Sequence, residues 1–162
     1  MTIMHVTLTG TTLDAKRKQR LASRLIDAFA RIEVGQSTPA VRAGFVVRID
    51  EVEPENLWMG DAKMSDASPA GRAAIVNARV MGGPWSDAMK AELFVEIEDA
   101  VRDVAEMRRA ANGTDFWMTI VEVPDGGWGL GGKPVSIGKL APAFEEERQQ
   151  RIEKYLRDRE KR

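Results

Sequence analysis

The sequence FWMTIVEV at residues 116–123 has a counterpart earlier in the chain, FVVRIDEV at residues 45–52. Both segments end in Glu-Val, and a glycine follows nine positions after each glutamate, Gly60 in the first case and Gly131 in the second. This similarity indicates that one unit occurs twice in the chain. Three further matches recur at nearly the same interval: Gly10 with Gly82, Asp27 with Asp99, and Ala28 with Ala100.

Each copy has the order strand, helix, strand. In the first copy, residues 3–8 alternate in polarity, residues 11–14 offer helix-capping side chains, and apolar residues then follow at helical spacing. The second copy has a strand at 74–81, a helix that starts after Ser86 and a strand at 115–123. Such an order predicts β-α-β units with parallel strands and right-handed crossovers. We expect residues 1–64 and 73–140 to be the two units of one compact domain, joined by a linker at 65–72.

The number of helices limits how much of the sheet can be covered. Residues 116–121 are apolar on both faces, which is typical of a strand buried on both sides. Two helices shield only one face of a four-stranded, mainly parallel sheet, so we expect an α/β (α+β) fold whose other face packs on further subunits. Residues 141–162 begin with acidic and end with basic side chains, which predicts a charged C-terminal helix.

Composition excludes several functions. The 24 basic and 25 acidic side chains give a net charge of −1, so no nucleic-acid partner is expected. The absence of cysteine and the single histidine, His5, argue against a metal site, and no cofactor is indicated. No segment is long and apolar enough to span a bilayer, so we expect no membrane partner and a cytoplasmic location.

The turns that follow the two units resemble the hairpin of the tautomerase superfamily. Residues 127–133, GWGLGGK, place an aromatic residue before glycine, an aliphatic residue and two glycines, and residues 55–61, ENLWMGD, are a looser copy. Together with the duplication, the first 140 residues or so resemble the fused members that are similar to cis-3-chloroacrylic acid dehalogenase. The resemblance implies a homotrimer in which the hairpin reaches a neighbour's pocket, and a small-molecule carboxylate as ligand.

The residues that perform this family's chemistry are replaced in the present chain. The resemblance implies a catalytic proline, exposed by removal of the initiator methionine, but Thr2 stands at that position and the second unit begins with Ala73. The other expected functional positions are also altered: Thr11, Gly83, Val46 and Trp117 replace substrate-binding arginines, Phe29 replaces a histidine, and Leu130 replaces a water-activating glutamate.

The terminal α-amine is the candidate catalytic base. It belongs to Met1 or, if the methionine is removed, to Thr2, and an unperturbed α-amine has a pKa of about 7.7 to 8.0. The alternative is that Met1 only plugs the pocket. Arg48 and Arg79 lie in otherwise apolar strands, where an arginine needs an anionic partner. Each therefore binds an acidic ligand or forms an ion pair with a nearby carboxylate.

Three tryptophans are candidates for the walls of a substrate pocket. Trp85, Trp117 and Trp128 would form a flat apolar pocket if they converge, and otherwise they belong to the core. Trp128 lies in a glycine-rich turn without local core residues, so we expect it to line a pocket or a subunit interface.

Two functions stay open at this point. One is a weak or divergent tautomerase or isomerase, or a related hydratase, that acts on small 2-oxo or unsaturated acids through the terminal amine. The other is a non-catalytic trimer that serves as a binding or structural scaffold. The missing proline and arginines distinguish both from an efficient tautomerase.

Overall fold

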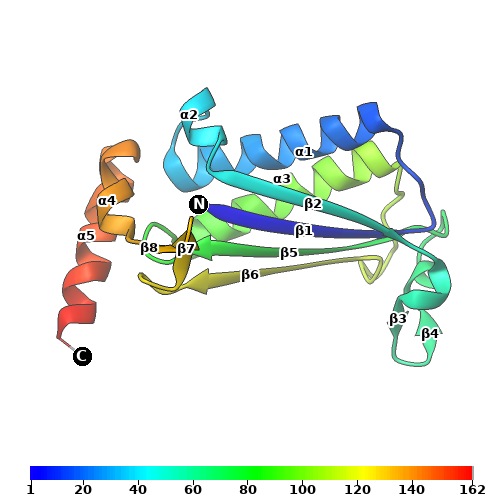
Figure 1. Ribbon diagram of the computed structural model, residues 1–162. Helices are drawn as coiled ribbons and strands as arrows, with labels where there is room; N and C mark the ends of the chain where they lie inside the picture. The colour runs from blue at the N-terminus through cyan, green and yellow to red at the C-terminus, as the bar shows by residue number, and fades with distance from the viewer. Residues whose placement is uncertain (162) are drawn as a thin grey trace.

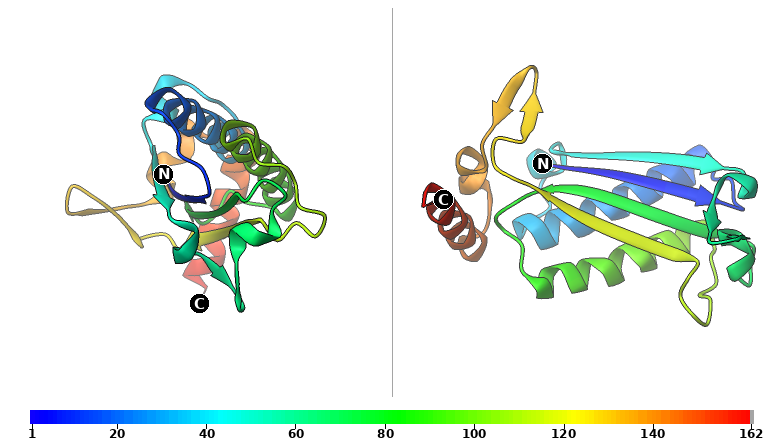
Figure 2. Two further views of the ribbon diagram at one scale, coloured as in Figure 1. Left: turned by 90° about the vertical axis from the view of Figure 1, so that its right-hand side faces the viewer. Right: turned by 90° about the horizontal axis from the view of Figure 1, so that it is seen from below.

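The structure is a computed structural model that describes residues 1–161. A four-stranded sheet has the order β2-β1-β5-β6, and helices α1 and α3 lie side by side on one of its faces (Figures 1 and 2). This arrangement confirms the α+β fold expected from the sequence. The main elements are β1 (Thr2–Thr9), α1 (Ala15–Phe29), β2 (Phe45–Val52), β5 (Ala73–Met81), α3 (Asp87–Ala105) and β6 (Phe116–Val123).

The sheet is mixed. β1 and β2 are parallel, as are β5 and β6, so each β-α-β unit forms a parallel pair. The two units meet through antiparallel pairing of β1 with β5, in which His5 faces Asn77. These two residues occupy equivalent positions of the repeat, which places an approximate two-fold axis between them. The duplicated sequence therefore produces an internally symmetric sheet.

The smaller elements surround the two ends of this sheet (Figure 1). They comprise a π-helical turn (Ala30–Val34), α2 (Pro39–Arg42), the hairpin of β3 (Trp58–Met59) and β4 (Ala62–Lys63), and the hairpin of β7 (Trp128–Leu130) and β8 (Lys133–Val135). The chain ends with α4 (Ile137–Leu140) and α5 (Glu146–Glu160), and short 3₁₀ turns occur at Pro54–Asn56, Met64–Ala67 and Ala141–Ala143.

Both long helices begin at a side-chain cap and bury one apolar stripe. Asp14 accepts a hydrogen bond from the Arg17 amide at the start of α1, and Ser86 does the same for Met89 at the start of α3. Fully buried residues then recur along the stripe that faces the sheet, and the even-numbered residues of β1 meet them. These core residues are Leu21, Leu25 and Phe29 of α1, Leu93, Ile97 and Val101 of α3, and Met4, Val6 and Leu8 of β1.

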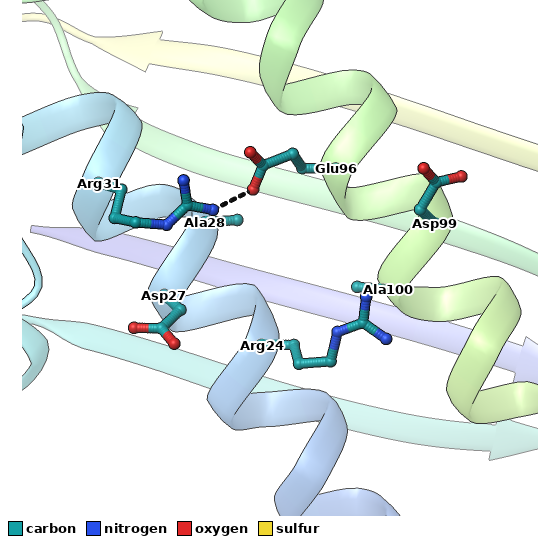
Figure 3. Close-up of a pocket in the computed structure, with 7 residues that line it drawn as sticks. All are labelled: Arg24, Asp27, Ala28, Arg31, Glu96, Asp99 and Ala100. Carbon is teal, nitrogen blue, oxygen red and sulfur yellow. Dashed lines mark hydrogen bonds and ion pairs between the residues drawn. The ribbon is translucent and has the colours of Figure 1, made fainter.

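Charges across the outer surface of α1 and α3 pair the two units with each other. Figure 3 shows this surface, a groove of about 380 Å³ that lies over Ala28 and Ala100. Arg31 binds Glu96, and Arg24 lies 2.5 Å from Asp103. The repeat makes Arg24 equivalent to Glu96 and Arg31 equivalent to Asp103. If two copies of the first unit paired in this way, Arg31 would face Arg24. If two copies of the second unit did so, Glu96 would face Asp103. Both contacts would bring like charges together.

The same groove is an unpromising ligand site, because its charged side chains already have partners within the protein. Asp27 accepts hydrogen bonds from Ser37 and Arg42, and Asp99 lies 3.6 Å from Arg109. Small side chains, Ala28 and Ala100, line the groove between these charged residues, and the ion pairs hold the two helices together.

The opposite face of the sheet carries exposed apolar side chains. Ile3 is in register with Val46 on one side and with Arg79 on the other, and Arg79 is in register with Val121. Ile3, Val46 and Val121 are all exposed, as is Trp117 further along β6. In the right-hand view of Figure 2, no helix within residues 1–161 lies over this face. A surface of this composition is typical of a protein interface.

Candidate active site at the N-terminus

A buried glutamate lies beneath the start of β1. Glu33 belongs to the π-helical turn Ala30–Val34 that prolongs α1, and its side chain is fully buried. The sequence places it four residues after Phe29 and eight after Leu25, on the apolar stripe of the helix. That spacing carries the carboxyl group into the protein, and π-helical turns often occur at functional sites.

The Glu33 carboxyl group contacts the first two residues of the chain. Its Oε2 atom accepts a hydrogen bond from the Thr2 hydroxyl at 2.7 Å, and its Oε1 atom lies 3.9 Å from the α-amine of Met1. Oε1 accepts no hydrogen bond from any described residue. Burial raises the pKa of Glu33 to about 7, although the terminal amine and the Thr2 hydroxyl act in the opposite direction. The carboxyl group therefore changes its charge near neutral pH.

Two pockets flank Met1. The first, about 190 Å³, is lined by Met1, Thr2, Ile3, Ala43, Gly44, Val46, Trp128, Gly129 and Leu130, none of which has a charged side chain. The second, about 130 Å³, is lined by Met1, Val34, Ala40, Val41, Gly44, Phe45, Leu140, Ala143 and Phe144. Because Met1 and Gly44 border both pockets, the terminal residue stands between two mostly apolar spaces. The terminal residue, which is itself half-buried, therefore borders mainly apolar side chains.

Trp128 belongs to the wall of the first pocket. It also packs into the main hydrophobic core through residues distant in sequence, and it is 8% exposed within its own chain. The β7–β8 hairpin begins near the start of β1 (Figure 1), and Trp128 lines the same pocket as Met1. Its Nε1 atom has no hydrogen-bond partner among residues 1–161.

The other two tryptophans lie elsewhere. Trp85 packs edge-on against Phe29, with 6.2 Å between ring centroids, and donates a hydrogen bond to the Met81 carbonyl. Trp117 is 53% exposed on the uncovered face and donates to the Thr114 carbonyl. The three rings therefore do not form one pocket.

The two candidate arginines share the uncovered face of the sheet. Arg48 lies 2.9 Å from Asp50 and is largely exposed, while Asp50 also pairs with His5 at 2.6 Å. Hydrogen bonds from Arg48 and then His5 lower the pKa of Asp50. Arg79 is exposed and lies opposite Ile3, a residue that lines the first pocket. Of the two, Arg79 is therefore nearer in register to the terminal site, and Arg48 already has a carboxylate partner.

Sequence reasoning missed Glu33. The signal was present, because a glutamate flanked by Ile32 and Val34 continues the four-residue spacing of buried positions in α1. Its partner, however, is 31 positions away at Thr2, and only the folded chain brings the two together. The second unit has no such group, since alanine occupies the equivalent position, Ala105. Within residues 1–161 no cluster of acidic, histidine or cysteine side chains could hold a metal ion.

Comparison with known proteins shows what this fold resembles. No protein-family model and no curated protein sequence matches the chain. Among solved structures, a wild-type fused 4-OT described as a symmetric trimer has a TM-score of 0.63 at 18% identity, with 83% of this chain and 94% of that chain covered. N1, a member of the cis-3-chloroacrylic acid dehalogenase family, has a TM-score of 0.66 at 17% identity, with 94% and 99% covered.

A macrophage migration inhibitory factor-like protein from Entamoeba histolytica is also similar, with a TM-score of 0.61 at 10% identity and coverage of 83% and 98%. At these identities the comparison concerns the fold. None of the described helices has the length and apolar character of a membrane span. The chain thus shares its fold with fused 4-OT, with a member of the cis-3-chloroacrylic acid dehalogenase family and with a macrophage migration inhibitory factor-like protein, and it has a buried glutamate beside its first residue.

Proposed function

We propose that this protein is a divergent tautomerase-type isomerase or hydratase that transfers a proton on small 2-oxo or unsaturated acids, with its terminal α-amine as the base. The observation that carries the proposal is the 3.9 Å separation between the Met1 amine and the Oε1 atom of buried Glu33. A neutral α-amine can take up a proton from carbon and, as the ammonium ion, return it. The adjacent carboxylate stabilises the ammonium ion that forms in between.

The proton balance of a tautomerisation fits these two groups. The neutral amine removes a proton from the carbon next to the substrate carbonyl, which leaves an enolate, and the ammonium group then returns that proton at the new position. No net charge enters or leaves the site. Glu33 supports the charged amine when the carboxyl group is ionised, so the reaction should depend on pH near 7. Arg79, across from Ile3, is the side chain best placed to attract a substrate carboxylate.

We also propose that the protein is a homotrimer. The exposed apolar residues on the uncovered sheet face support this assembly, because burying them requires further subunits. The fused 4-OT that shares this fold is described as a symmetric trimer. Light scattering at micromolar concentration should give the mass of three chains, and a stable monomer would contradict the assembly.

A non-catalytic trimer is the second candidate function. It is favoured by one observation, namely that the nine residues that line the first pocket include no charged side chain to bind a substrate carboxylate. On this view the fold has been kept for binding or structural purposes, and the space around Met1 is filled by apolar groups.

Ketonisation of phenylenolpyruvate, followed by absorbance, distinguishes the two functions. Intact mass first identifies the terminal residue as Met1 or Thr2. We expect slow turnover that is lost after acetylation of the terminal amine, which abolishes its basicity, and strongly reduced by Glu33→Gln. Glu153→Gln on the exposed side of α5 is the control. Absence of turnover in a folded trimer, or turnover that survives blocking of the amine, would contradict the enzymatic proposal.

A further inference from the structure

The C-terminal arm, defined here as residues 141–160, binds the backbone of the turn that carries Glu33. The Arg148 guanidinium group donates hydrogen bonds from Nε and Nη2 to the Ile32 carbonyl, both at 3.4 Å. The Glu145 amide donates to the Val34 carbonyl at 2.9 Å. The carbonyls on both sides of Glu33 are therefore held by a segment more than 100 positions away in the sequence.

Two further contacts extend this attachment along the chain. Gly35, with φ of 92°, lies directly against the Glu145 side chain, so that even an added Cβ atom would collide with it. The Gln36 side chain donates a hydrogen bond to the Ala143 carbonyl at 2.8 Å. The arm consequently contacts Ile32, Val34, Gly35 and Gln36, which surround Glu33 on both sides.

The turn needs such support for a physical reason. The last carbonyls of a helix have no partner within the helix and must find donors elsewhere. Glu33 adds to the cost, because a carboxyl group with an unpaired oxygen is unfavourable in a buried site. If the arm were released, the turn could rotate or fray and bring the carboxyl group to water.

We propose that Arg148 and the backbone amide of Glu145 are positioning groups for Glu33, which hold the Ala30–Val34 turn so that the carboxyl group stays buried beside the terminal amine. The inference rests on the proposed function in giving Glu33 a role in proton transfer. Its test measures the state of the carboxyl group directly and does not require turnover.

The charged and polar groups around Glu33 come from the start of β1, from the arm and from the neighbouring Arg31. From the start of β1 come the Met1 amine and the Thr2 hydroxyl. From the arm come Arg148 and Glu145, which contact the backbone carbonyls of Ile32 and Val34 and bind each other at 2.9 Å. The neighbouring Arg31 is paired with Glu96 of α3. A change in the pKa of Glu33 in an arm variant can therefore be attributed to solvent access, provided that the contacts of Met1 and Thr2 with the carboxyl group are monitored as well.

Two pairs of variants isolate the two contacts. Glu145→Pro removes the amide that binds Val34, and the φ of −62° at this position already suits proline. Glu145→Ala keeps the amide and is the matched control. Arg148→Ala removes the guanidinium group, with Arg148→Lys as the conservative variant. Arg157→Ala is the control on the same helix, because Arg157 is paired only with Glu153 among the described residues, at 3.7 Å.

The readout is the titration of the Glu33 carboxyl carbon by ¹³C NMR, assigned by the loss of its signal in Glu33→Gln. In the unaltered protein the pKa should be about 7. In Glu145→Pro and Arg148→Ala it should fall toward the ordinary glutamate value as water reaches the carboxyl group. Glu145→Ala and Arg157→Ala should leave it unchanged, and Arg148→Lys should restore part of the shift.

The outcomes separate this inference from the proposed function. If the pKa of Glu33 stays raised in both Glu145→Pro and Arg148→Ala, the arm does not position the carboxyl group and the inference is wrong. If it falls in both while the unaltered protein shows no turnover, the inference holds and the enzymatic function fails. Should Arg148→Ala not fold, Glu145→Pro decides the matter, because its backbone conformation is already compatible with proline.

Discussion

Replacing Glu33 with glutamine tests the energetic state of the buried carboxyl group. The folded protein raises the pKa of Glu33 from 4.5 to about 7, mainly because burial disfavours the charged form. Between these two values the folded state keeps a proton that the unfolded state has released. The free energy of unfolding therefore falls as the pH rises through this window, and the contribution is fully present only below it.

The size of the effect follows from the shift. Each pKa unit corresponds to about 1.4 kcal/mol, so the Glu33 contribution should decrease by roughly 3 kcal/mol between acidic and alkaline pH. Glutamine is nearly isosteric, can still accept the hydrogen bond from Thr2, and carries no charge to bury. Glu33→Gln should therefore lack this decrease and be more stable than the unaltered protein above pH 8, by up to the same amount.

Urea unfolding at pH 4.5, 6 and 8.5, at fixed protein concentration, measures the effect. The decisive quantity is the difference in the free energy of unfolding between the two proteins at each pH, because it cancels the contributions that both proteins share. Glu153→Gln, an exposed replacement on α5, should change the free energy of unfolding by less than about 0.5 kcal/mol at any pH. A difference between Glu33→Gln and the unaltered protein that does not vary with pH would refute the reasoning.

Three other replacements test the fold. Arg31→Glu should cost about 0.5 to 1 kcal/mol by facing Glu96, and adding Glu96→Arg should recover it in a double-mutant cycle. Asp115→Ala removes the buried carboxylate that accepts two hydrogen bonds from Arg102 and leaves Glu98 as the remaining carboxylate partner, so urea unfolding should show a loss of about 3 to 5 kcal/mol. Trp128→Ala should also cost about 3 to 5 kcal/mol within the single chain, and a loss confined to trimer dissociation would contradict its place in the core.

The periodic features of this chain could be read from its residues. The alternation of β1, the spacing of Leu21, Leu25 and Phe29 in α1, and the cap at Ser86 each depend on neighbours in sequence. The parallel pairing within each unit follows from the order strand, helix, strand. The ion pair of Arg48 with Asp50 was one of the two expected outcomes and also involves residues of the same strand.

The candidate site was predicted only in part. The terminal amine was expected from the resemblance to one fold family, but its partner Glu33 was missed. From the sequence alone, a glutamate that will be buried cannot be distinguished from an exposed charged residue near the end of an amphipathic helix. Trp128 was expected at a pocket or an interface, but its packing into the main core could not be read from a glycine-rich hairpin, which gives no local sign of it.

The sequence was sufficient to establish two repeated β-α-β units and one uncovered sheet face, since both follow from local periodicity and the number of helices. Three-dimensional packing was needed to place Glu33 beside Met1 and Thr2 and to bring the C-terminal arm onto the turn of Glu33. These contacts join segments that are tens to more than one hundred positions apart. Their energies depend on burial, which is a property of the assembled core and cannot be assigned to any one stretch of the chain.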